Sequence, residues 1–250
     1  MIPKIIHYCW FGGKEKPEQV QAYIDDWKEQ LPNYTFMEWN ESNVDIPHSI
    51  AYVQEAYEAG KYAFVSDYVR VDALCKYGGV YFDTDIELIK DFSAMLPEAD
   101  VLLCYESKQT LCTAFMASAA EHALFASFRA SYHDRHFKKK DGTLDTTTIN
   151  RALTDHLSAA GIKMEERNHR EDGNIAIYTS DYFSAQDLDH GHPYITENTY
   201  TVHRFNASWA NKKRGLAKVK AVMKYKVLRP MLQKILGYEK ADRLMDRAKK

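Results

Sequence analysis

Hydrophobic and polar positions along the first 210 residues alternate between short apolar runs and longer stretches with helical spacing. Short runs rich in β-branched and aromatic residues predict buried strands, whereas apolar residues at three- and four-residue steps predict helices. The predicted strands span residues 2–11, 34–39, 80–82, 101–105, 113–117, 175–178 and 200–203. The predicted helices span residues 17–31, 49–60, 62–77, 122–136 and 146–160, the last with Asp145 as its N-cap. This alternation predicts an α/β domain with a mostly parallel sheet.

The predicted strand at residues 80–82 runs directly into Asp83-Thr84-Asp85, just after the helix-stopping pair Gly78-Gly79. Ligands of open α/β sheets bind beyond the carboxyl ends of the strands, so both aspartates are expected at the mouth of the sheet. Two neighbouring carboxylates are a poor choice for packing there. They are a good choice for holding a divalent cation against a diphosphate.

The helix before that strand carries Asp67 and Arg70, which are three residues apart and therefore share one helix face. One interpretation is an exposed ion pair within the helix, worth a few tenths of a kcal/mol. The other is a polar pair directed into a cleft, where a carboxylate and a guanidinium hydrogen-bond sugar hydroxyls. The sequence leaves both open.

Four sequence blocks occur in a fixed order along the chain. They are Ile-Pro-Lys-Ile-Ile-His-Tyr-Cys-Trp-Phe-Gly-Gly (2–13), Ser-Asp-x-x-Arg (66–70), Tyr-Gly-Gly-Val-Tyr-Phe-Asp-Thr-Asp (77–85) and His-x-x-x-x-Ser-Trp (203–209). In these blocks the chain resembles the glycosyltransferases that carry a DXD sugar-binding region. That family includes bacterial capsular-polysaccharide transferases and fungal initiating mannosyltransferases, and its catalytic core is similar to that of glucosylating toxins. The resemblance covers roughly residues 1–210.

The resemblance implies a GT-A-type, Rossmann-like fold with a mostly parallel mixed sheet. It also implies a nucleotide-diphosphate sugar donor, with a UDP-sugar favoured, and Mn²⁺ or Mg²⁺ as the cofactor. Transfer of a hexose would proceed with retention of the anomeric configuration. The implied acceptor is a glycan, most simply a lipid-linked oligosaccharide intermediate of a surface polysaccharide.

The same resemblance implies roles for four residues that bind the donor. Trp10 would stack on the base, with Tyr8 nearby. Asp67 and Arg70 would hold the donor sugar and count among the catalytic residues.

The resemblance assigns five further residues to the cation and the diphosphate. Asp83 would contact the ribose or the sugar and assist the metal, while Asp85 would ligate the metal directly, and both count among the catalytic residues. His203 is the expected third protein ligand. Ser208 and Trp209 would close over the diphosphate.

The charge of the chain divides it at about residue 212. Residues 212–250 hold 14 lysines and arginines against three acidic residues, although the net charge of the whole chain is −2. Apolar residues recur there at helical steps, which predicts a basic amphipathic helical tail after a domain at residues 1–211. Such a tail favours an anionic membrane surface, and the alternative is a helix packed on its own acidic domain. Nucleic acid is not expected as a partner, because the acidic domain would repel it.

The compartment follows from the cysteines and the amino terminus. Cys9, Cys75, Cys104 and Cys112 show no Cys-x-x-Cys spacing and lie in apolar stretches, which indicates reduced core residues. The first residues lack the charged and apolar regions of a signal peptide. A cytoplasmic protein is expected, with the tail on the inner face of the plasma membrane.

Two other functions fit parts of the sequence. A strand followed by Asp-x-Asp also occurs in metal-dependent phosphohydrolases, but Glu87 stands where those sequences have a small or β-branched residue. A non-enzymatic, membrane-associated carbohydrate-binding protein would use the tail, yet it would not need a carboxylate pair suited to a metal.

Overall fold

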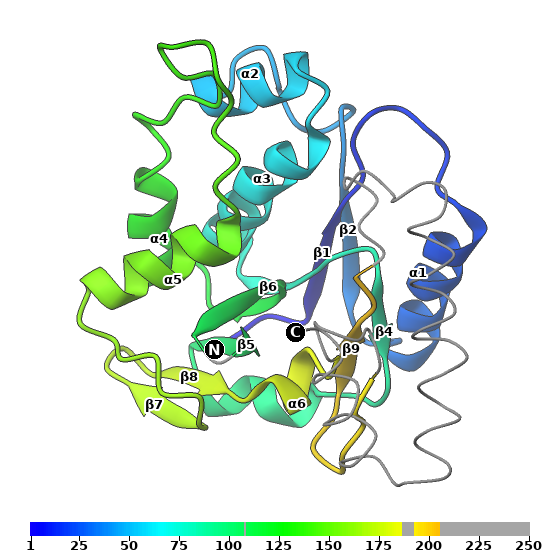
Figure 1. The fold of residues 1–250 in the computed structure, drawn as a ribbon. Coiled ribbons are helices and arrows are strands. Elements are labelled where there is room, and N and C mark those ends of the chain that lie inside the picture. Colours follow the sequence, from blue (N-terminus) through cyan, green and yellow to red (C-terminus); the bar gives the residue numbers. More distant parts are fainter. Residues whose placement is uncertain (108, 187–192, 206–250) are drawn as a thin grey trace, which may run out of the picture. The chain divides into compact units, whose positions relative to one another are not determined.

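The computed structural model describes residues 1–107, 109–186 and 193–205 (Figure 1). The strands are β1 (Ile5–Cys9), β2 (Thr35–Trp39), β3 (Gly79–Phe82), β4 (Ile86–Leu88), β5 (Val101–Ser107), β6 (Thr110–Ser118), β7 (His169–Glu171), β8 (Ile175–Tyr178) and β9 (Thr201–His203). The helices are α1 (Glu18–Gln30), α2 (Ala51–Glu58), α3 (Tyr62–Tyr77), the 3-10 helix η1 (Ser93–Glu98), α4 (Ala123–Ala130), α5 (Ile149–Ala159) and α6 (Ser180–Phe183).

Seven strands form one mixed sheet in the order β2-β1-β3-β6-β5-β8-β7. Strands β2, β1, β3, β5 and β8 point the same way, whereas β6 and β7 run against their neighbours. The prediction of an α/β fold with a mostly parallel sheet is therefore confirmed. The carboxyl ends of β1, β3 and β5 share one edge of this sheet, which places residues far apart in sequence near one another.

Two apolar clusters cover the two faces of the sheet. One cluster joins the sheet to α2, α3, α4 and α5, and the other joins it to α1, η1 and α6. The second cluster also contains Ile86 and Leu88 of β4, which pairs with β9 in a separate two-stranded sheet. In Figure 1 this pair, here called the β4–β9 ribbon, runs beside α1. The core is thus a three-layer arrangement.

Two glycines fix the passage from α3 into β3. Gly78 and Gly79 have φ angles of +64° and +101°, in the left-handed region that side chains disfavour. A Cβ at Gly79 would lie 2.7 Å from the carbonyl oxygen of Ile5, and His7 Nε2 lies 2.8 Å from the carbonyl oxygen of Gly78. Only glycine lets the turn approach β1 this closely. The pair therefore sets where β3 ends and where its aspartates lie.

Two details of the predicted elements are wrong. The helix expected at residues 122–136 ends at Ala130, where Ser131 Oγ turns back to the carbonyl oxygen of Phe128. The N-cap of α5 is Thr148 and not Asp145, because the Asp145 carboxylate instead pairs with Arg135 at 2.8 Å. A long-range ion pair thus replaces the local cap that the sequence suggested.

The predicted tail at residues 212–250 lies outside the described residues, as do Ser208 and Trp209 of the fourth block. Within the described part of the chain, no helix has the length and apolarity needed to span a bilayer.

Candidate active site at the carboxyl edge of the sheet

A buried group of charged residues joins α3 to the end of β3. The Nη2 atom of Arg70 lies 3.1 Å from Asp67 Oδ1, and its Nη1 atom lies 3.1 Å from Asp83 Oδ1. The same Nη1 donates to the carbonyl oxygen of Thr113 at 2.9 Å. The guanidinium lies over the ring of Tyr81, whose hydroxyl donates to Asp83 Oδ1 at 3.0 Å. These five residues are here called the Arg70 network.

The burial of this network decides between the two interpretations of its helical ion pair. Asp67 is 7% exposed and Arg70 is 5% exposed, so the exposed-pair interpretation is wrong. Burial raises the pKa of Asp67 to about 7, an effect that Arg70 opposes and the charge of Asp83 reinforces. One guanidinium is shared between two carboxylates, so the network holds more acidic groups than it can fully compensate.

The second aspartate of the motif is held by the β4–β9 ribbon. In the register of this ribbon Ile86 is opposite His203, and the amide of Arg204 donates to the carbonyl oxygen of Asp85 at 3.0 Å. As a result, His203 Nε2 lies 3.2 Å from Asp85 Oδ1. A residue predicted as a metal ligand from a late sequence block is thereby brought to the DXD motif.

Asp83, Asp85 and His203 each offer one ligand atom, and these atoms all lie within 4.8 Å of one another. Two carboxylate oxygens and an imidazole nitrogen suit Mn²⁺, and carboxylates also suit Mg²⁺. The side chains of Asp83 and Asp85 are 28% and 17% exposed, so both are partly accessible. The donor set fits a divalent cation.

The environment of His203 is electrostatically unusual. Burial lowers its pKa, but the hydrogen bond to Asp85 and the charges of Cys112 and Asp85 outweigh burial and raise the pKa well above its ordinary value. Its Nδ1 atom is buried and has no hydrogen-bond partner among residues 1–107, 109–186 and 193–205. A buried polar atom without a partner is costly, which makes this ring a candidate ligand for a cation.

Three residues that the sequence reasoning did not assign to the site also lie here. Glu106, near the carboxyl end of β5, and Cys112, on β6, form a second group with His203, with ligand atoms within 4.8 Å of one another. Burial raises the pKa of Glu106 to about 8, helped by the nearby charge of Cys112 and opposed by His203. Asn150 accepts a hydrogen bond from Thr113 Oγ1 at 2.7 Å.

A signal for Glu106 was present in the sequence. It directly follows the predicted strand at residues 101–105, just as Asp83 follows the strand at residues 80–82. Asp83 was selected because ligands of such sheets bind beyond the carboxyl ends of the strands. The same rule applies to Glu106.

The residues expected to bind the base lie at the end of β1. The backbone amide of partly buried Trp10 donates to the carbonyl oxygen of Trp39 at 2.9 Å, and its indole Nε1 donates to the carbonyl oxygen of Lys14 at 2.6 Å. Tyr8 is buried against Trp27, and its hydroxyl donates to Glu38 at 3.2 Å. Tyr8 is therefore a packed residue between β1, β2 and α1, while Trp10 stands at the strand end.

Ser208 and Trp209, expected to close over the diphosphate, lie outside the described residues. The site as described thus consists of the Arg70 network, the pair of Asp85 and His203, and Trp10 at the end of β1.

Comparison with known proteins connects this site to a family. Residues 17–102 match the family described as "Glycosyltransferase sugar-binding region containing DXD motif". Among solved structures, the PaToxG glycosyltransferase is similar with a TM-score of 0.50 and 17% identity, over 64% of this chain and 70% of that chain. A glycosyltransferase involved in the glycosylation of the major capsid of PBCV-1 gives a TM-score of 0.49 and 7% identity, over 82% and 95%. No curated protein matches the chain.

The matched segment contains the two parts of the site that adjoin in space. It includes α3 with Asp67 and Arg70, and it includes the motif of Asp83 and Asp85 at the end of β3. The GT-A-type fold and the resemblance inferred from the four blocks are confirmed. Residues 17–102 are therefore similar to the DXD-containing sugar-binding region of glycosyltransferases.

Proposed function

We propose that this protein is a retaining, metal-dependent glycosyltransferase that moves a hexose from a nucleotide-diphosphate sugar to a glycan acceptor. A UDP-sugar is the favoured donor, and a lipid-linked intermediate of a surface polysaccharide is the favoured acceptor. The observation that carries the proposal is the meeting of Asp83, Asp85 and His203, whose ligand atoms lie within 4.8 Å of one another. A late strand brings the histidine to a carboxylate pair that packing alone does not require.

In this proposal Asp85 and His203 hold Mn²⁺ or Mg²⁺, with Asp83 assisting. When bound, the cation acts as a Lewis acid that offsets the negative charge developing on the departing diphosphate. His203 supplies a neutral imidazole nitrogen, so it must release its proton when the cation binds. The buried surroundings of His203 keep the ring in one orientation.

The Arg70 network holds the sugar of the donor. Its guanidinium is fixed by Asp67, Asp83 and the carbonyl oxygen of Thr113, so it does not need to be reorganised when the sugar binds. The carboxylates of Asp67 and Asp83 accept hydrogen bonds from sugar hydroxyls. A fixed carboxylate beside the ring also stabilises the positive charge that develops at the anomeric carbon.

Trp10 stacks on the base of the nucleotide, in line with its position at the end of β1 and the glycine turn that follows it. The amide of Gly12 donates to Glu41 at 2.6 Å, and a Cβ at Gly12 would lie 2.5 Å from the ring of Tyr62. The turn therefore requires glycine. Ser208 and Trp209 complete the proposal by closing over the diphosphate.

Thermal unfolding with nucleotide sugars tests this function. UDP-glucose, UDP-galactose, UDP-N-acetylglucosamine and GDP-mannose are each added with and without Mn²⁺. A true donor at 100 times its Kd stabilises the native state by about 2.7 kcal/mol, and the effect should need the cation. Failure of every nucleotide sugar to raise the Tm in Mn²⁺ would contradict the proposal, as would hydrolysis of simple phosphate esters by the purified protein. If donor hydrolysis first releases the sugar with the same anomeric configuration as in the donor, transfer proceeds with retention.

The tail at residues 212–250 is proposed to hold the enzyme on an anionic membrane surface, on the cytoplasmic face where lipid-linked acceptors are built. This rests on its 14 basic residues and its helical apolar pattern. Deletion of residues 216–250 should weaken binding to anionic liposomes and leave donor hydrolysis unchanged. Equal liposome binding by the two proteins would show that the tail has another role.

A further inference from the structure

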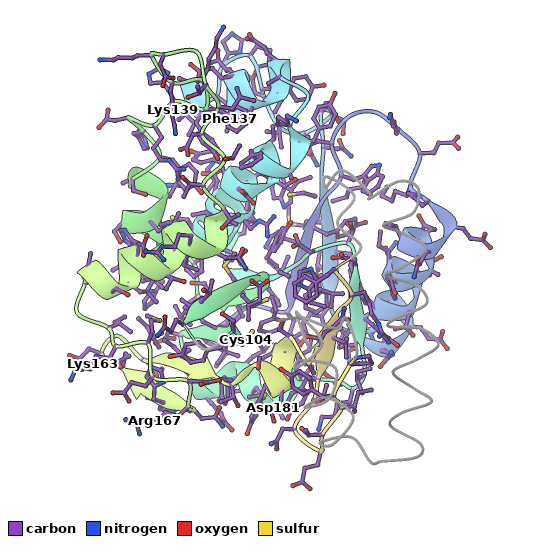
Figure 2. The ribbon with its side chains drawn as sticks, in the orientation of Figure 1. Cys104, Phe137, Lys139, Lys163, Arg167 and Asp181 are labelled. Carbon is purple, nitrogen blue, oxygen red and sulfur yellow. The ribbon has the colours of Figure 1, made fainter. Side chains whose placement is uncertain are left out.

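The group of Glu106, Cys112 and His203 offers a combination of ligand atoms that the proposed function does not use. A carboxylate oxygen, a sulfur and an imidazole nitrogen lie within 4.8 Å of one another. They come from three strands, β5, β6 and β9, so the group exists only in the folded chain. Cys104, labelled in Figure 2, is the register partner of Cys112 across β5 and β6 and lies beside this group.

The two nitrogens of His203 have different surroundings. Nε2 lies 3.2 Å from Asp85 Oδ1 and therefore faces the DXD motif. Nδ1 is buried and has no hydrogen-bond partner in the part of the chain that the structure describes. Because the residue is only 9% exposed, water does not readily satisfy this atom. Nδ1 is the ring nitrogen left for a second ligand.

The chemistry of the group selects a different cation from the DXD motif. Thiolate and imidazole ligands favour Zn²⁺. Two carboxylates with one imidazole suit Mn²⁺ better, and sites made of oxygen ligands alone suit Mg²⁺. Cys112 is fully buried, and Glu106 is partly exposed. The carboxylate thus lies on the side from which a cation enters.

We propose that Glu106, Cys112 and His203 form a second cation site, which binds Zn²⁺ and inhibits the enzyme. The two sites share one imidazole. A dication on Nδ1 makes Nε2 a poorer ligand for a second dication, because the two positive charges repel across the ring. Zn²⁺ binding itself is independent of the proposed function, and only its inhibitory consequence rests on that function.

Cobalt spectroscopy on the full-length protein tests the site directly. Co²⁺ replaces Zn²⁺ in such sites, and its bond to a thiolate gives a charge-transfer absorption in the near ultraviolet. We expect this band to saturate at one equivalent of Co²⁺ in a protein kept reduced, and to be displaced by Zn²⁺. Cys112→Ser should abolish the band. Cys75→Ser is the control: it removes a different buried thiol, on α3, and should retain the cobalt band. An equal band in wild type and Cys112→Ser overturns the proposal.

A second variant covers the case in which Cys112→Ser fails to fold. Glu106→Gln keeps the thiol and should keep the band, but we expect it to bind Co²⁺ at least about tenfold more weakly, the lower end of losses for altered metal sites. Unchanged Co²⁺ affinity in this variant overturns the proposal.

A third variant separates this inference from the proposed function. Asp85→Asn removes the metal ligand of the DXD motif but none of the zinc ligands, so the cobalt band should persist. Loss of the band in Asp85→Asn, with the fold intact, would show that there is one site and not two. In wild type, micromolar Zn²⁺ should lower Mn²⁺-dependent donor hydrolysis, and Cys112→Ser should resist that inhibition.

Discussion

The two aspartates of the DXD motif are separated by one residue, yet they belong to differently built regions. Asp83 lies in the Arg70 network, where a guanidinium, a tyrosine hydroxyl and a second carboxylate surround it. Asp85 lies against the β4–β9 ribbon, where its partner is the ring of His203. Arginine keeps its charge at any ordinary pH, whereas histidine can lose its proton to solvent when a cation binds.

This difference suggests that the two aspartates of one short motif have separate roles, one toward the sugar and one toward the cation. The permanent charge of Arg70 neutralises Asp83 in part and keeps it available for neutral hydroxyls. In the proposed function, loss of a proton from His203 lets Asp85 exchange an imidazolium partner for a metal ion. We therefore expect Asp83 to act mainly on the sugar and Asp85 mainly on the cation.

The largest expected effect comes from removing the charge at the centre of the network. Arg70→Met should lower the free energy of unfolding by about 3–5 kcal/mol, because it leaves buried carboxylates without a partner. Urea unfolding measures this. Arg151→Met is the matched control, since Arg151 also pairs with an aspartate on its own helix, Asp155, but is exposed. It should cost less than about 0.5 kcal/mol. Equal losses would mean that the network is not buried as described.

The next effect distinguishes the two aspartates. Asp85→Asn should reduce Mn²⁺-dependent donor hydrolysis by about 10²–10³-fold, the scale for losing one group that stabilises developing charge. Asp83→Asn should impair Mn²⁺ binding less than Asp85→Asn does, which calorimetric titration can compare. If Asp83→Asn instead weakened Mn²⁺ binding more than Asp85→Asn does, Asp83 and not Asp85 would be the main metal ligand.

A smaller effect is expected from the partner of Asp85. His203→Gln should weaken Mn²⁺ binding by about tenfold, at the lower end for altered metal sites, because one of three protein ligands is lost. The fraction of free Mn²⁺ seen by electron paramagnetic resonance reports the change. His156→Gln, at a histidine bonded to Ser127 on the other layer, serves as the control. Unaltered binding by the His203 variant would remove this residue from the metal site.

The smallest effect concerns the pH dependence of stability. The pKa of Asp67 is raised to about 7 in the folded protein, so between pH 4 and 7 the folded state binds more protons than the unfolded state. The contribution of Asp67 is therefore full below about pH 4 and is lost as the pH rises through about 7. Asp67→Asn should flatten the profile by at least about 1.4 kcal/mol, the value of one pKa unit. Parallel profiles for the two proteins would contradict the raised pKa.

Much of the fold could be predicted because its signals are local. The helix at Tyr62–Tyr77 was predicted at its observed bounds, since apolar spacing and the glycine pair mark both its course and its end. The strand at Ile175–Tyr178 was predicted equally well. In contrast, β4 and β7 were not predicted, because β7 (His-Arg-Glu) has no apolar residue and β4 (Ile-Glu-Leu) directly follows the polar Asp-Thr-Asp motif. Their pairing depends on partners elsewhere in the chain.

The candidate site could be predicted only in part, for a similar reason. The residues of α3 and β3 stand in recognisable blocks, and the fourth block supplied His203. The sequence did not indicate that Tyr81 would bond to Asp83, or that the carbonyl oxygen of Thr113 would accept from Arg70. Backbone acceptors leave no residue type to recognise. Cys112 was interpreted only as a core residue, because its closeness to His203 arises from the meeting of two separate sheets in the fold.

The β4–β9 ribbon has a consequence for how the protein folds. Its two strands have three residues each, and pairing them closes a loop of more than one hundred residues, a step with a substantial entropic cost. The chain can therefore assemble its large sheet before the ribbon pairs, and a nascent polypeptide that has not reached His203 cannot form the proposed cation site. Catalytic competence would then be acquired last, and cation binding would help to lock the ribbon in place.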